Sequence, residues 1–193
     1  DSKRPRMIAL LIAPSNSGDA PAAGGSLPQL LHSKGIAVVS LATIEETERV
    51  ALHYTFDYVP VAMTSKPIIF PDNPGPDCGK ALCPQPAPLF GEGAAYGFGL
   101  NPLGAELVVG PRSRAQLSFG LTGGALWFDK RVPITSATRF NFTASASAAL
   151  TIVGEDGHGA SVGYRLHHLS NAGLATNPGL ASHVVFVGIR WAG

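Results

Sequence analysis

Hydrophobic and polar residues alternate along most of the chain with the two-residue period that is typical of β-strands. In the clearest segment, residues 140–152, positions held by Phe, Ala, Leu and Ile alternate with positions held mainly by Asn, Thr and Ser. Residues 115–127 and residues 50–58 show the same alternation. Because successive side chains of a strand point to opposite faces, the pattern predicts amphipathic strands with one apolar face and one face of small or polar residues.

The alternation predicts eight strands, and turn-forming residues separate several of them. The predicted strands are Arg6–Ala13, Gly35–Thr43, Val50–Tyr58, Tyr96–Val109, Ala115–Trp127, Phe140–Ile152, Ala160–Ser170 and His183–Trp191. We expect a break in the fourth strand near Asn101-Pro102. Asn, Asp, Gly and Pro cluster at residues 16–19, 155–159 and 177–179, as turns require. Only Leu27–Ser33 has the pattern of a short helix.

Eight amphipathic strands joined by polar turns favour an all-β fold, an antiparallel up-and-down β-barrel, because closure leaves no sheet edge unpaired. A β-sandwich stays open as an alternative, since the number of strands does not separate the two folds. We predict one barrel domain over residues 1–193. One long Pro-rich loop, at about residues 66–93, interrupts it.

Composition excludes several classes of protein. Charged residues make up 14% of the chain, against about 25% in typical soluble domains, and the net charge is +1. A net charge this small provides no excess of basic residues to bind nucleic acid, so we expect no nucleic-acid partner. The longest apolar run, Met7 to Ala13, is too short for a transmembrane helix of about 20 residues. The apolar strand faces and low charge favour lipid contact, but four Tyr and two Trp are few for two aromatic girdles.

The two cysteines carry information about the cellular compartment of the protein. Cys78 and Cys83 lie in the Pro-rich loop, with no histidine or second cysteine pair nearby to complete a zinc site. We therefore expect a disulfide between them, and no metal or other cofactor. Two unpaired cysteines are the alternative. A disulfide would place the protein outside the cytoplasm, and a chain that starts at Asp1 also fits removal of a secretory signal.

The densest cluster of reactive side chains lies at residues 163–173. His168 and Ser170 are two residues apart, so on a strand they point to the same side. A histidine base beside a hydroxyl can activate a serine nucleophile. Asn171 follows, and its backbone N–H or side-chain amide could stabilise an oxyanion. His-x-Ser alone is a weak signal that arises by chance in many chains, and taken by itself it more often marks a purely structural hydrogen bond.

The surrounding sequence resembles the PagL-type lipid A 3-O-deacylases, an acyloxyacyl hydrolase-like family. The most specific part is His-Leu-Ser-Asn-Ala-Gly at residues 168–173, followed by Asn-Pro-Gly at 177–179 and a last strand, Val184–Trp191. The similarity continues upstream, over residues 96–104, 123–128 and 139–143, and more faintly over 49–63.

This resemblance implies an eight-stranded outer-membrane barrel that removes an acyl chain from lipopolysaccharide on its outer surface. It also implies that His168 is the general base, Ser170 the nucleophile and Asn171 an oxyanion donor.

One departure from the family pattern concerns the third member of the triad. In the family, an acidic residue follows the serine by about a dozen positions, near the start of the last strand. Here that region reads Leu-Ala-Ser-His at residues 180–183, and no Asp or Glu occurs from Ala172 to Gly193. The acid orients the imidazole and stabilises its positive charge. Substitutes could come only from elsewhere in the fold, and the candidates are Asp57, Glu106, Glu155 and Asp156.

Three functions fit these observations. The first is a non-catalytic descendant of the deacylase barrel, a structural or lipid-contacting subunit of a membrane complex. It would lie in the outer membrane of a Gram-negative-type bacterium or at the periplasmic face of a membrane, and a photosynthetic reaction-centre or antenna assembly is one setting to test. The loop at 66–93 would then hold partner contacts.

The second function is an active lipid A 3-O-deacylase, a serine esterase. The third is a lipocalin-like carrier of an apolar ligand, which needs a roomy barrel interior. A carboxylate within hydrogen-bond reach of His168 would favour the second function over the first.

Overall fold

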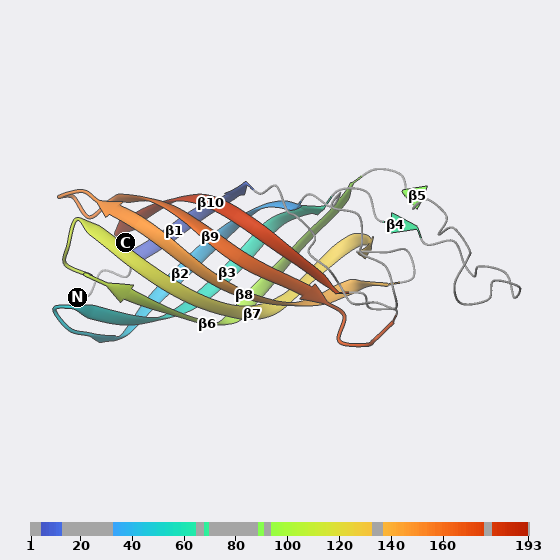
Figure 1. The fold of residues 1–193 in the computed structure, drawn as a ribbon, viewed down its shortest axis with the longest axis horizontal. Helices are drawn as coiled ribbons and strands as arrows, with labels where there is room; N and C mark the ends of the chain where they lie inside the picture. The colour runs from blue at the N-terminus through green and yellow to red at the C-terminus, as the bar shows by residue number, and fades with distance from the viewer. Residues whose placement is uncertain are drawn as a thin grey trace, which may run out of the picture.

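The predicted strands form a single closed antiparallel barrel (Figure 1). The computed structural model describes residues 5–12, 33–64, 68–69, 89–90, 94–132, 137–175 and 179–192. The barrel strands are β1 (Pro5–Ile12), β2 (Ser33–Glu46), β3 (Val50–Thr64), β6 (Ala95–Val109), β7 (Ala115–Val132), β8 (Thr138–Val153), β9 (Gly159–Ser170) and β10 (Leu180–Ala192). Each strand pairs with the next along the chain, and β1 pairs with β10 to close the barrel. The barrel prediction is therefore confirmed, and a sandwich is excluded.

Most strands extend beyond the ranges that alternation predicts, and β7 continues to Val132. The expected break near Pro102 is a shift of register between Leu100 and Leu103 in the ladder of β6 with β7, inside a continuous strand. Such an irregularity bends a strand without ending it. Of the predicted helix at 27–33, only Ser33 is described, and it begins β2.

The two ends of the barrel differ in their connections. Short turns at residues 47–49, 110–114 and 154–158 lie at one end, where the start of β1 also meets the end of β10. The longer connections leave the opposite end, where the small strands β4 (Ile68–Ile69) and β5 (Leu89–Phe90) pair with each other (Figure 1). Cys78 and Cys83 lie outside the described residues, so their disulfide stays a prediction.

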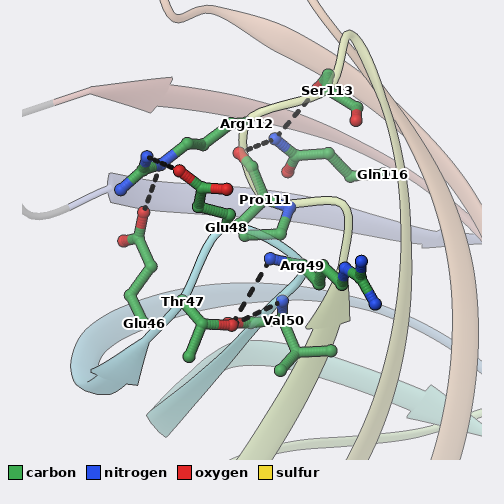
Figure 2. Close-up of polar contacts among 9 residues, drawn as sticks. All are labelled: Glu46, Thr47, Glu48, Arg49, Val50, Pro111, Arg112, Ser113 and Gln116. Atoms are coloured by element: carbon green, nitrogen blue, oxygen red, sulfur yellow. Dashed lines mark hydrogen bonds and ion pairs between the residues drawn. The ribbon is translucent and has the colours of Figure 1, made fainter.

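Polar contacts fix the short turns (Figure 2). Arg112 reaches across to the neighbouring turn, where its guanidinium lies 3.7 Å from Glu46 and 3.8 Å from Glu48. The backbone N–H of Val50 donates to Thr47 Oγ1 at 3.1 Å. These groups are exposed to solvent, and exposed ion pairs contribute only about 0–1 kcal/mol each. The turns at this end are thus short, hydrogen-bonded and rich in charge.

The barrel wall is apolar on its outside. Large hydrophobic side chains point outward from β2, β3 and β6 to β10, and at least a third of each of these side chains is exposed. Most of the polar and charged side chains that are buried point into the lumen, among them His53, Asp57, Gln116 and Arg165. An apolar exterior around a polar interior is the arrangement of a barrel that spans a lipid bilayer. The outer wall is therefore a lipid-facing surface.

No helix within the described ranges is long and apolar enough to cross a membrane.

Charged and polar side chains fill the lumen. Arg165 lies 3.7 Å from Asp57 and stacks over the ring of Phe186, with 5.6 Å between its guanidinium carbon and the ring centroid. His53 lies 3.6 Å from Glu106. Two lumen cavities lined by described residues measure about 40 and 70 Å³. Eight strands enclose a space just wide enough for side chains, and neither cavity has room for an apolar ligand, which argues against a lipocalin-like carrier.

Candidate functional site

His168 and Ser170 lie on the outer wall, near the barrel end with the longer connections. Both point outward from β9, and Ser170 is its last residue. His168 is exposed and sits between Ala144 on β8 and Ala181 on β10, while Ser170 is half-buried and faces Phe142 on β8. The structure therefore brings the two residues together on one face, as their spacing predicts. A base and a hydroxyl placed in this way can act together on an ester that lies over them.

The turn after Ser170 has an unusual backbone. Ala172 has a φ of 52°, and it is the only residue other than glycine in the described ranges with a positive φ. This conformation costs about 1–2 kcal/mol for a residue with a Cβ, and such strain concentrates at functional sites. It directs the backbone N–H of Ala172 to Ser170 Oγ at 3.2 Å. The strained turn thus places a backbone donor beside the hydroxyl, a group that the sequence does not reveal.

Asn171 is completely buried behind this turn. Its Oδ1 accepts the N–H of Gly173 at 3.0 Å, and its carbonyl oxygen accepts the N–H of Leu174 at 3.1 Å. The side chain therefore stabilises the turn that follows the serine. Its role as an oxyanion donor stays a prediction.

Gly179 packs directly against the imidazole of His168. A Cβ at position 179 would lie 3.2 Å from His168 Cε1, and the φ of Gly179 is 66°. Both the close approach and the backbone conformation favour glycine here. The histidine ring therefore leans toward the turn that precedes β10.

No described carboxylate forms an ion pair with His168. Asp57 and Glu106 point into the lumen, on the opposite side of the wall from His168. Glu155 and Asp156 lie in the turn between β8 and β9, roughly 30 Å away at the other end of β9. The four substitutes that the sequence offers for the triad acid are therefore placed where they cannot contact His168.

The register of β10 identifies the position that faces the imidazole. Ala181 is the partner of His168, and its side chain is on the outer wall. Ser182, a dozen residues after Ser170, is only 1% exposed and pairs with His167 on the inner side. His167 lines a lumen cavity, as expected for the residue that faces opposite to His168. On β10, position 181 is the one that faces His168 directly across the strand pair, so a carboxylate there could orient the imidazole.

An apolar groove of about 910 Å³ leads away from His168 along the outer wall. It begins at His168 and Ala181 and crosses β8, β7 and β6 to Tyr54 on β3. We name it the alanine groove; its outward-facing wall consists of Leu103, Ala105, Leu121, Ala144, Ala146 and Leu166. The groove is not among the features predicted above, although the sequence holds a signal for it, because the apolar face of β8 changes from Phe to Ala at residue 144.

Within the described residues, no group of three His, Cys, Asp or Glu side chains could hold a metal ion.

Comparison with known proteins places this site in a family. The sequence profile of the family described as lipid A 3-O-deacylase (PagL) matches residues 91–190, more than half of the chain. The chain belongs to the PagL family. The matched segment covers β6 to β10, and with them His168 and Ser170. A search of curated protein sequences found no match.

Among solved structures, the barrel is similar to the crystal structure of the outer membrane enzyme PagL. The TM-score is 0.53 at 14% sequence identity, over 95% of this chain and 97% of that one. The PagL fold thus extends to the part of the barrel that the family profile does not match. The protein is a lipid A deacylase-like β-barrel, and the resemblance read from residues 168–173 is confirmed.

Proposed function

We propose that this protein binds lipid A in the outer membrane and that its deacylase site is impaired. The observation that carries the proposal is the pairing of His168 with Ala181, because the position that faces the imidazole across the strand pair holds a methyl group and not a carboxylate. The alanine groove supplies the binding surface, because it is apolar, open to lipid and ends at His168.

The chemistry of the site explains why catalysis is impaired while binding is retained. An acyl chain in the alanine groove brings its ester carbonyl to Ser170, and the N–H of Ala172 lies beside the attacking oxygen. As Ser170 attacks, its proton passes to His168, which becomes positively charged on a surface that faces lipid. A charge without a partner is costly in an apolar medium, and the methyl group of Ala181 offers no compensation. Binding of an acyl chain in the alanine groove does not depend on this charge.

The connections of the barrel indicate its orientation. Outer-membrane barrels have short periplasmic turns and longer extracellular loops. The short turns at 47–49, 110–114 and 154–158 would therefore face the periplasm, and Ser170 would lie toward the extracellular side. This is the leaflet that holds lipopolysaccharide. We accordingly place the site in the outer leaflet and not at the periplasmic face.

Binding and hydrolysis are tested separately on the purified protein in detergent. Native mass spectrometry with added lipid A measures binding, and release of 3-hydroxy fatty acid measures hydrolysis. We expect lipid A to bind with little release. Ala146→Phe should fill the alanine groove and abolish binding, whereas Val162→Leu, on the outer wall away from the groove, should not. Absence of lipid A binding by the wild-type protein would refute the proposal.

An active deacylase is the second candidate. The outward placement of His168 and Ser170 on one face, with a backbone donor beside the hydroxyl, favours it. Ready release of fatty acid by the wild-type protein, lost in Ser170→Ala, would establish this activity instead.

Membership of a membrane complex through the loop at 66–93 stays a prediction. Deletion of residues 68–90 should leave the barrel folded and release the protein from its partners. Unchanged co-purification of those partners would contradict it.

A further inference from the structure

A second apolar groove lies on the outer wall next to the alanine groove, displaced along β6, β7 and β8 toward the ends of these strands that carry the longer connections. It measures about 710 Å³ and crosses β6, β7 and β8. We name it the aromatic groove; its outward-facing residues include Phe98, Leu100, Leu103, Trp127, Phe140 and Phe142. Phe142 is the partner of Ser170, whereas Ala144, the partner of His168, lines the alanine groove. Leu103 lines both grooves, so their apolar surfaces are continuous.

Three aromatic rings line one side of this groove. Trp127 and Phe140 are cross-strand partners with ring centroids 6.3 Å apart. Phe140 and Phe142 meet edge to face at 5.1 Å. Both geometries lie in the range in which aromatic pairs attract each other. The three rings therefore pack against one another in a row. The row ends at Phe142, which lies beside Ser170.

Gly123 leaves the middle of the groove open. It faces outward on β7, and a Cβ there would meet only carbonyl oxygens of Thr143 and Leu103, at 3.7 and 3.9 Å, which are ordinary contacts. The next residue differs, because a Cβ on Gly124 would lie 2.1 Å from the carbonyl oxygen of Leu100. Packing of the barrel thus accounts for Gly124 but not for Gly123, although glycine weakens a strand interior. What the missing side chain provides is space on the outer wall.

We propose that the aromatic groove holds a second acyl chain of the same lipid whose first chain occupies the alanine groove. This inference rests on the proposed function. A lipid with its ester at Ser170 has its sugar between the two grooves, and its neighbouring chain extends over Phe142. Bulk membrane lipid is as apolar as the barrel wall, so the hydrophobic effect does not favour one lipid over another. How closely an acyl chain packs against the aromatic groove therefore decides which lipid occupies it. The tether to the first chain raises the effective concentration of the second above that of bulk phospholipid.

Trp127 reports occupancy of the groove directly. The chain contains two tryptophans, so Trp191→Phe leaves Trp127 as the only one. This variant is placed in phosphatidylcholine nanodiscs and titrated with lipid A that carries brominated acyl chains, which quench tryptophan fluorescence on contact. Brominated phosphatidylcholine is the reference. We expect brominated lipid A to quench Trp127 at a lower mole fraction than the reference lipid does.

Gly123→Leu tests the groove itself in the same background. The leucine should fill the groove, and the preference for lipid A in quenching should be lost. Lipid A should stay bound through the alanine groove, as native mass spectrometry measures. Val162→Leu is the matched control, because it enlarges a lipid-facing side chain outside both grooves. Should Gly123→Leu fail to fold, Ala125→Leu narrows the same groove.

The outcomes separate this inference from the proposed function. If lipid A binds but quenches Trp127 no better than phosphatidylcholine, the second groove is not an acyl site and the proposed function stands. The second groove is likewise not an acyl site if folded Gly123→Leu keeps the preference for lipid A. If lipid A does not bind the wild-type protein at all, both the proposed function and this inference fail.

Discussion

Ala181→Glu should restore ester hydrolysis, because it places a carboxylate opposite His168. The two residues are direct cross-strand partners on the outer wall, and Cα atoms of such partners are about 5 Å apart. The imidazole leans toward Gly179 and not straight across, so the longer glutamate suits the position better than aspartate. The substitution faces lipid near the barrel end, where an acidic residue destabilises a barrel by about 1 kcal/mol or less.

The size of the gain follows from the role of the acid. Replacing the acid of a serine protease triad lowers kcat by about 10⁴-fold, which is roughly 5 kcal/mol at 1.36 kcal/mol per tenfold change. A misplacement of about 1 Å can cost 10²-fold, and the glutamate has no surrounding groups that fix it. We therefore expect Ala181→Glu to release 3-hydroxy fatty acid from lipid A roughly 10²-fold faster than the wild-type protein.

Three variants make this experiment decisive. Ala181→Gln has the same size without the charge and should recover little. Ser182→Glu adds the same carboxylate one residue later, but into the lumen, and should recover nothing. Ser170→Ala added to Ala181→Glu should remove the gain. Equal rates for the wild type, Ala181→Glu and Ala181→Gln would show that the missing carboxylate is not what limits the site.

Three other changes test the structure at separate places. In the Ala181→Glu background, Gly179→Ala should push the His168 imidazole aside, lower activity and destabilise the barrel by about 1–2 kcal/mol through its positive φ; unchanged rates and thermal unfolding would contradict this. Asp57→Ala leaves Arg165 buried without its partner and should lower the free energy of unfolding in urea by about 3–5 kcal/mol; removing both charges together should cost less than Asp57→Ala alone. Mass spectrometry of the unreduced protein should find Cys78 and Cys83 joined, and two freely alkylated thiols would disprove it.

The strands could be predicted from the sequence because alternation over long segments is a strong signal, and all eight are in place. Which face of each strand lies inside the barrel could not be predicted. A segment such as residues 50–58 has one apolar and one polar face whether its apolar face lies inside or outside the barrel. Asp57, Glu106 and Arg165 all fall on the polar face, which would face water in a soluble barrel but lines the lumen here.

Counting residues along the sequence predicts one part of the candidate site and not another. His168 and Ser170 share a face because both lie on one strand, and their spacing alone predicts it. The position of the missing acid depends on the pairing of β9 with β10, which spacing does not fix. A dozen residues after Ser170 comes Ser182, but a slip of one residue moves a side chain to the opposite face of a sheet. The structure therefore assigns the position to Ala181.

The packed lumen has a consequence for the membrane that holds this barrel. Arg165 pairs with Asp57 and Arg190 donates to Gln116, so polar side chains from opposite strands meet across the interior. Two cavities between described residues measure only about 40 and 70 Å³, room for a few water molecules each. The protein should therefore be electrically silent in a planar bilayer and should not admit antibiotics. Many copies of such a barrel would then leave the permeability barrier of the surrounding membrane intact.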